Sequence, residues 1–186
     1  WKNIEVIEEQ YIEKFTICSF DIECTSKDGT FPQPSRIEDK IIQIGLTMSR
    51  YGEADCYEKH LLSLGETDDI EGATVEWYET EVDLLLGFAK LIRKLNPDIM
   101  TGYNIFGFDW KYIKGRIDRL TQFLKDQGKN MEANKFKISV EKLSRINNDI
   151  SNFEEKNLSS SALGENILTF YKMSGRVQVD LMQVVQ

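Results

Sequence analysis

Residues 15–24 read F-T-I-C-S-F-D-I-E-C, an apolar run that ends in two carboxylates. Alternate side chains of a β-strand share a face, so Asp21 and Glu23 are expected to point the same way. At about 3.3 Å of rise per residue their Cα atoms would lie roughly 6.5 Å apart, a gap that carboxylate arms can close onto one cation or a pair of cations. This strand end therefore predicts a metal platform. The alternative is an exposed strand end whose two acids are only solvated.

The length and composition suit one soluble globular domain. The chain has 186 residues, of which 41% are hydrophobic and 29% charged. No apolar run approaches the ~20 residues of a membrane span, so we expect no membrane partner. The three cysteines form no C-x-x-C pair, and no signal peptide precedes them, which indicates a reducing intracellular compartment.

The charge balance bears on possible partners. The net charge is −8 and the sequence pI is near 4.8. Tight, independent nucleic-acid binders usually carry a basic face, so this balance argues against one. It remains compatible with an acidic site that holds a substrate end through metal ions while other domains supply the phosphate contacts.

The pattern of apolar and turn residues predicts an α/β domain with one mixed sheet. Helix 80–95 has Thr80 as its N-cap and Asp83 three residues on, and Asn96-Pro97 ends it. The next helix carries its buried stripe from Trp110 to Leu120. The other expected elements are strands at 15–24, 40–48, 56–64 and 98–104, a loop at 26–35, and a strand pair at 166–173 and 175–180 that turns at Ser174-Gly175.

Two stretches stand apart from this core. Residues 121–166 are rich in Lys, Asn, Glu and Ser, and they are interpreted as an insertion, helical around 136–146. Residues 1–14 are interpreted as the end of a preceding N-terminal domain or a linker. The chain begins at Trp1 without an initiator methionine and stops inside V-D-L-M-Q-V-V-Q, so we expect it to be a piece of a larger protein.

A third carboxylate follows another core strand. In G-Y-N-I-F-G-F-D, Asp109 comes just before the second helix, and two such positions can meet at one end of an α/β sheet. A cluster of Asp21, Glu23 and Asp109 would repel itself unless cations bound it. Oxygen ligands without clustered Cys or His favour Mg²⁺ or Mn²⁺ over zinc.

Several of these stretches resemble one known family. F-D-I-E-C and G-Y-N-I-F-G-F-D-W-K-Y-I resemble the first two exonuclease motifs of the family B DNA polymerases, as does G-T-F-P-Q-P-S-R with I-I-Q-I-G between them. G-R-V-Q-V-D-L-M-Q-V-V is similar to the segment that follows them there. The resemblance covers about 15–186 apart from the insertion, and it is strongest to the delta-type polymerases of eukaryotes and of large DNA viruses.

The resemblance implies a 3′→5′ proofreading exonuclease with the ribonuclease-H-like fold of the DEDD exonucleases. It assigns two divalent ions, Mg²⁺ or Mn²⁺, to Asp21, Glu23 and Asp109. It places Asn104 and Phe108 beside the terminal nucleotides of a single-stranded primer 3′ end. Alternatively, Asn104 caps the helix and Phe108 belongs to the core. The insertion of the delta-like enzymes contains a β-hairpin, and residues 158–177 resemble its surroundings.

The chain also departs from the family. The third motif, a Y-x-x-x-D on a last helix that supplies a fourth carboxylate, is not present, and neither Tyr78 nor Tyr171 matches it. Asp180 precedes an apolar run, so it is interpreted as an N-cap rather than a substitute ligand. His60 lies mid-strand and is interpreted as structural. The cations of the second helix touch phosphates or are only solvated; they are Lys111, Lys114, Arg116 and Arg119.

These observations lead to one main hypothesis and two alternatives. The main hypothesis is the proofreading domain of a replicative DNA polymerase, truncated before its third motif and therefore weak or inactive alone. The remaining polymerase domains, and a sliding clamp through the parent protein, would be its partners in the nucleus or a viral replication compartment. The alternatives are an inactive exonuclease-like scaffold and a stand-alone RNA-trimming nuclease, which would need a complete third motif with histidine.

Overall fold

The structure is a computed structural model that describes residue 8, residues 13–160 and residues 164–185. The expectation for residues 1–14 lies largely outside these residues. The elements along the chain are β1 (Thr16–Cys24), β2 (Ile41–Arg50), β3 (Cys56–Leu64), β4 (Thr74–Tyr78), α1 (Glu81–Leu95), β5 (Ile99–Gly102), α2 (Asp109–Asp126), α3 (Asn130–Val140), β6 (Asn152–Ser160), β7 (Gly164–Lys172), β8 (Val177–Asp180) and a short 3₁₀ helix, η1 (Leu181–Gln183).

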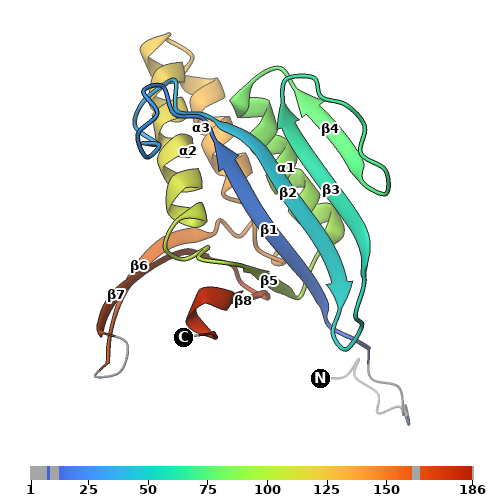
Figure 1. Ribbon diagram of the computed structural model, residues 1–186. Helices are drawn as coiled ribbons and strands as arrows, with labels where there is room; N and C mark the ends of the chain where they lie inside the picture. The colour runs from blue at the N-terminus through green and yellow to red at the C-terminus, as the bar shows by residue number, and fades with distance from the viewer. Residues whose placement is uncertain (1–7, 9–12, 161–163, 186) are drawn as a thin grey trace, which may run out of the picture.

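Six strands form one mixed sheet in the order β4-β3-β2-β1-β5-β8. β1, β2 and β3 pair antiparallel, whereas β5 runs parallel to β1, β8 parallel to β5, and β4 parallel to β3. Figure 1 shows α1, α2 and α3 on the same side of this sheet. The helices thus cover one face, and the mixed α/β class expected from the sequence is confirmed.

The alternation along β1 follows the expected period of two. Cys18, Phe20 and Ile22 are buried under the helices, while Asp21 and Glu23 are exposed on the opposite face. Phe20 packs between two rings from the helices, with its ring centroid 5.7 Å from that of Phe88 and 4.6 Å from that of Trp110. Burial of one face therefore holds the register of β1 and sets the direction of its acids.

The first helix begins and ends as its sequence predicts. The Thr80 hydroxyl accepts a hydrogen bond from the backbone N–H of Asp83, and Asn96 adopts a left-handed conformation just after the last turn. These two caps satisfy backbone groups that the helix leaves unpaired.

The predicted strand pair at 166–173 and 175–180 is wrong. β7 pairs antiparallel with β6 in a separate two-stranded sheet, and β8 pairs with β5 instead. A buried side chain redirects the chain after the turn at Ser174-Gly175, because Arg176 donates hydrogen bonds to the carbonyls of Leu143 and Pro97. Figure 1 shows β6 and β7 extending away from the main sheet as the β-hairpin expected for the insertion.

The positions of α2 and α3 and the presence of β4 also differ from the expectation. The helix placed at 136–146 is α3, which begins at Asn130 and ends at Val140, and α2 continues to Asp126 inside the supposed insertion. Phe136 and Val140 pack into the main core. β4 was not expected, because its five residues show no buried position. No helix among the described residues is long and apolar enough to cross a membrane.

Candidate active site at the head of α2

Asp109 lies at the point where α2 meets the edge of β1. β5 pairs with β1 only from Ile17 to Ser19, and beyond that point the backbone N–H of Ile22 donates to Asp109 Oδ1 at 3.2 Å. The Asp109 side chain is 1% exposed. Sequence reasoning placed Asp109 at the start of a helix, and the structure adds that its carboxylate completes the hydrogen bonding of the first strand.

Asp21 and Asp109 interact directly. Burial raises the pKa of the Asp109 carboxyl to about 7, and the adjacent Asp21 carboxylate contributes further through its charge and a hydrogen bond between the two side chains. Two carboxyl groups so close cannot both ionise without cost, because like charges repel strongly in a poorly solvated site. The structure thus brings together two of the three acids that were expected to cluster, Asp21 and Asp109.

Glu23 stands apart from this pair. It is exposed on the same face of β1 as Asp21, two residues further along. Within the described residues, no three Asp, Glu, His or Cys side chains lie close enough to form a metal cluster. The acidic donor set nevertheless suits a hard divalent cation, because a cation would offset the repulsion between Asp21 and Asp109.

The segment between β5 and α2 is held by a carboxylate that sequence reasoning interpreted as a cap. Asp180 Oδ1 accepts from the backbone N–H of Asn104 at 2.8 Å and of Met182 at 3.0 Å, and its Oδ2 accepts from Phe106 N–H at 2.9 Å. Asp180 is therefore the N-cap of η1, as expected, and it also fixes the turn that leads to Asp109. Because both carboxylate oxygens of Asp180 already accept hydrogen bonds from the backbone, we interpret this residue as structural rather than as a metal ligand.

Asn104 and Phe108 occupy that turn. Asn104 has a left-handed backbone (φ 61°), and its carbonyl oxygen accepts from the N–H groups of Gly107 and Phe108. The N-cap position of α2 is Phe108, which makes no side-chain capping bond, so Asn104 is not the cap. Phe108 is half-buried, and its ring centroid lies 5.4 Å from that of Tyr112.

A cleft that sequence reasoning missed lies beside Phe108. Phe31, from the loop between β1 and β2, is 68% exposed and meets Phe108 edge to face, with ring centroids 5.4 Å apart. The cleft has a volume of 300 Å³ and is lined by Phe31, Pro32, Gln33, Pro34, Asn104, Gly107, Phe108, Lys111 and Tyr112. We call it the aromatic cleft. The sequence feature that could have indicated this cleft is the F-P-Q-P stretch, in which two prolines stiffen the loop next to an aromatic residue.

The cations of α2 have different roles. Lys111 is exposed and lines the aromatic cleft. Lys114 forms an ion pair with Asp118. Arg116 is not a surface charge, because it is fully buried against Glu81. The prediction that all four cations face solvent or phosphate is therefore wrong for Arg116.

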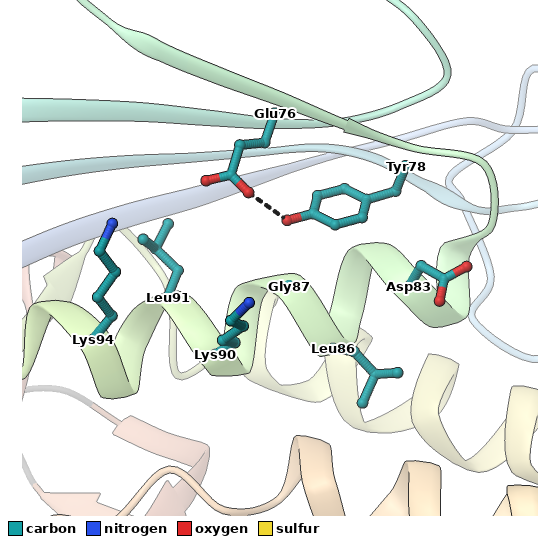
Figure 2. A pocket seen from close by; sticks show the side chains of 8 residues that line it. All are labelled: Glu76, Tyr78, Asp83, Leu86, Gly87, Lys90, Leu91 and Lys94. Atoms are coloured by element: carbon teal, nitrogen blue, oxygen red, sulfur yellow. Dashed lines mark hydrogen bonds between the residues drawn. The ribbon is translucent and has the colours of Figure 1, made fainter.

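Other candidates lie away from the acids. His60 is buried in β3 with its Nε2 2.7 Å from Glu58 Oε1, in keeping with a structural role. Tyr51 and Asp55 do have the Y-x-x-x-D spacing, but they lie in the turn between β2 and β3 rather than on a helix. A hollow of 470 Å³ lies between β4 and α1, where Tyr78 crosses α1 at Gly87. Figure 2 shows the side chains that line it. Asp21, Glu23 and Asp109 do not line this hollow.

Comparisons with known proteins identify the family of this chain. The family model "DNA polymerase family B, exonuclease domain" matches residues 1–186. The chain belongs to this family. It is 39% identical to a DNA polymerase of Acanthamoeba polyphaga mimivirus over its whole length, and 37% identical to the DNA polymerase delta catalytic subunit of Bos taurus over 96% of its length.

This exonuclease domain spans only a small part of those relatives, 14% of the viral polymerase and 15% of the bovine subunit. A family B DNA polymerase from Pyrobaculum calidifontis superimposes with a TM-score of 0.53 at 20% identity, covering 96% of this chain and 17% of that one. At this identity the superposition supports the fold, and it agrees with the ribonuclease-H-like class expected from the sequence.

Proposed function

We propose that this domain is a 3′→5′ exonuclease that removes the terminal nucleotide of a DNA strand within a replicative DNA-directed DNA polymerase. The observation that carries the proposal is the contact between Asp21 and Asp109 at the head of α2, close to the aromatic cleft. The reaction is hydrolysis of the last phosphodiester: a water oxygen loses a proton and bonds to phosphorus, and the P–O3′ bond breaks. The O3′ oxygen of the preceding nucleotide takes up a proton to become the new 3′ hydroxyl, and the terminal nucleotide leaves as a nucleoside 5′-monophosphate.

In this proposal Asp21 and Asp109 would hold the divalent ions, Mg²⁺ or Mn²⁺, and the exposed Glu23 side chain would turn toward them to complete the set. Ions bound there would lower the pKa of the attacking water. Their positive charge would offset the negative charge that develops on the leaving oxygen. The chain prepares the position: the hydrogen bond from Ile22 N–H fixes the Asp109 carboxylate, and the buried face of β1 directs Asp21 to the opposite side. The buried Asp109 carboxylate, fixed in this way, loses little conformational entropy when a substrate binds.

The aromatic cleft is the proposed site for the terminal nucleotide. Aromatic side chains stack on bases regardless of sequence, so Phe31 and Phe108 suit a proofreading enzyme that must remove any nucleotide. Asn104 at the cleft wall offers an amide for hydrogen bonds, and Lys111 offers a positive charge to a phosphate. The domain carries a net charge of −8, so the remaining polymerase domains are proposed to supply most of the contacts to DNA.

The test is removal of 3′ nucleotides from a single-stranded oligonucleotide with Mn²⁺ or Mg²⁺. We compare residues 1–186, a longer version of the chain that includes the next helix with the third motif, and that version with Asp21→Ala. We expect the longer wild type to digest DNA, Asp21→Ala to lose at least 100-fold in rate on the scale of lost catalytic groups, and residues 1–186 to be weak. Asp126→Asn, an exposed change on α2, is the control. A folded but inert longer chain would instead support the inactive scaffold.

A further inference from the structure

The loop at residues 26–40 forms one wall of the aromatic cleft but contains no helix or strand. Phe31 is mostly exposed, so burial does little to hold it in place. Its position beside Phe108 therefore depends on how the rest of the loop is fixed to the domain.

One buried side chain makes most of that connection. The Arg116 guanidinium donates from Nη1 to the carbonyls of Pro34 at 2.9 Å and Arg36 at 2.5 Å, and from Nη2 to the carbonyl of Ile37 at 3.3 Å. Arg116 is fully buried, so these bonds are shielded from water. Three carbonyls of the loop thus converge on one planar group.

The opposite side of the guanidinium is held by Glu81. Arg116 Nε donates to Glu81 Oε1 at 2.8 Å and Nη2 to Oε2 at 2.5 Å, and Oε1 also accepts from the N–H of Ile41, the first residue of β2. The carboxylate neutralises the buried charge and fixes the plane of the fork. Arg116 therefore joins α1, α2 and the start of β2 to the loop.

Two further contacts align the loop with the same face of α2. The Tyr112 hydroxyl donates to the carbonyl of Asp39 at 2.9 Å. Pro34 lies directly over Gly115, where an added Cβ would be 2.7 Å from the Pro34 Cβ. Neither contact replaces the three carbonyl bonds, because each touches the loop at a single residue.

We propose that Arg116 is a positioning residue for the exonuclease: it fixes the loop so that Phe31 stays in edge-to-face contact with Phe108 and the two rings together form the surface of the aromatic cleft that binds the terminal nucleotide. The inference rests on the proposed function. Lysine cannot take this role, because an ammonium group is a single point of charge and cannot reach three carbonyls and a carboxylate in one plane. Arg116→Lys keeps the charge and removes the fork.

The first experiment measures the loop without any activity. The Arg36 carbonyl that Arg116 holds belongs to the Arg36–Ile37 peptide bond, a trypsin site, so loss of the fork should expose this bond. The full-length polymerase is digested briefly and its fragments are followed by mass spectrometry. Arg116→Lys should raise cleavage at Arg36 about tenfold relative to cleavage elsewhere in the domain, in line with loss of charge-assisted hydrogen bonds.

The matched control is Arg93→Lys. Arg93, in the last turn of α1, also donates from its guanidinium to two backbone carbonyls, but those of Ser139 and Lys142, which belong neither to the loop nor to the cleft. This variant should cut at Arg36 at the wild-type rate. Two results would overturn the proposal. Unchanged cleavage at Arg36 in Arg116→Lys would show that Arg116 does not anchor the loop. Equal acceleration of cleavage at every site in the domain would show general unfolding instead of release of the loop.

The second experiment measures exonuclease kinetics on single-stranded DNA in the same full-length proteins. Arg116→Lys should raise KM about tenfold with kcat within about twofold, because it disturbs the binding of the nucleotide and leaves the acids in place. Arg93→Lys should match the wild type. A fall in kcat at constant KM would contradict the role assigned to Arg116. A wild type without exonuclease activity would overturn the proposed function, while the digestion would still decide whether Arg116 anchors the loop.

Discussion

The contact between Asp21 and Asp109 should make the metal-free domain less stable than a version with one charge removed. We consider Asp109→Asn, in which the amide oxygen still accepts the hydrogen bond from Ile22 N–H. Burial and the Asp21 carboxylate raise the pKa of Asp109 from 3.8 to about 7. Each unit corresponds to 1.36 kcal/mol, so ionised Asp109 costs the folded state at most about 4 kcal/mol.

The sign follows from the proton balance. The folded state keeps the Asp109 proton up to about pH 7, whereas the unfolded chain loses it near pH 3.8. Stability therefore falls as pH rises between these values and stays low above them. Because Asp21 is exposed, water screens part of the repulsion, and we expect a gain of about 2 kcal/mol for Asp109→Asn at pH 8. For a domain of this size that corresponds to a rise of roughly 4–8 °C in Tm.

The assay is thermal unfolding in EDTA at pH 8 and pH 4, followed by circular dichroism. Asp126→Asn makes the same substitution at an exposed site on the same helix and should change the free energy of unfolding by less than about 0.5 kcal/mol. The difference between Asp109→Asn and wild type should shrink at pH 4, and adding Mn²⁺ should stabilise the wild type more than the variant. A variant no more stable than the wild type at pH 8 would refute the cost that burial and the Asp21 charge are argued to place on ionised Asp109.

Two further predictions concern the core around β1. Gly102→Ala should destabilise the domain by about 2 kcal/mol, because the new Cβ would lie 2.5 Å from the carbonyl oxygen of Phe20. Gly45→Ala in β2 places its Cβ in open space and should cost less than about 1 kcal/mol. Denaturant titration of both variants measures the free energy of unfolding. Cys18 and Cys24 should stay unmodified by iodoacetamide at pH 8 in the native protein, because burial raises the pKa of each thiol to about 12 and keeps it protonated, and mass spectrometry would reveal any labelling.

The sequence alone determined the features that depend on neighbours along the chain. The period of two in β1 placed Asp21 and Glu23 on one face, and Thr80 marked the start of α1 through a hydrogen bond within its own first turn. The hairpin of β2 and β3 likewise joins adjacent segments. Such features arise from backbone geometry and short-range contacts, so a local pattern is enough to predict them.

The tertiary structure decided two features that need a choice between distant partners, the neighbour of β8 and the burial of Arg116. Residues 177–180 had the pattern of a strand, but only the buried Arg176 and the free edge of β5 selected their neighbour. Arg116 carries the same charge as its solvated neighbours on α2, yet the carboxylate of Glu81 and three loop carbonyls draw it into the interior. Local pattern does not reveal such choices, because they depend on which groups the packed chain leaves unpaired.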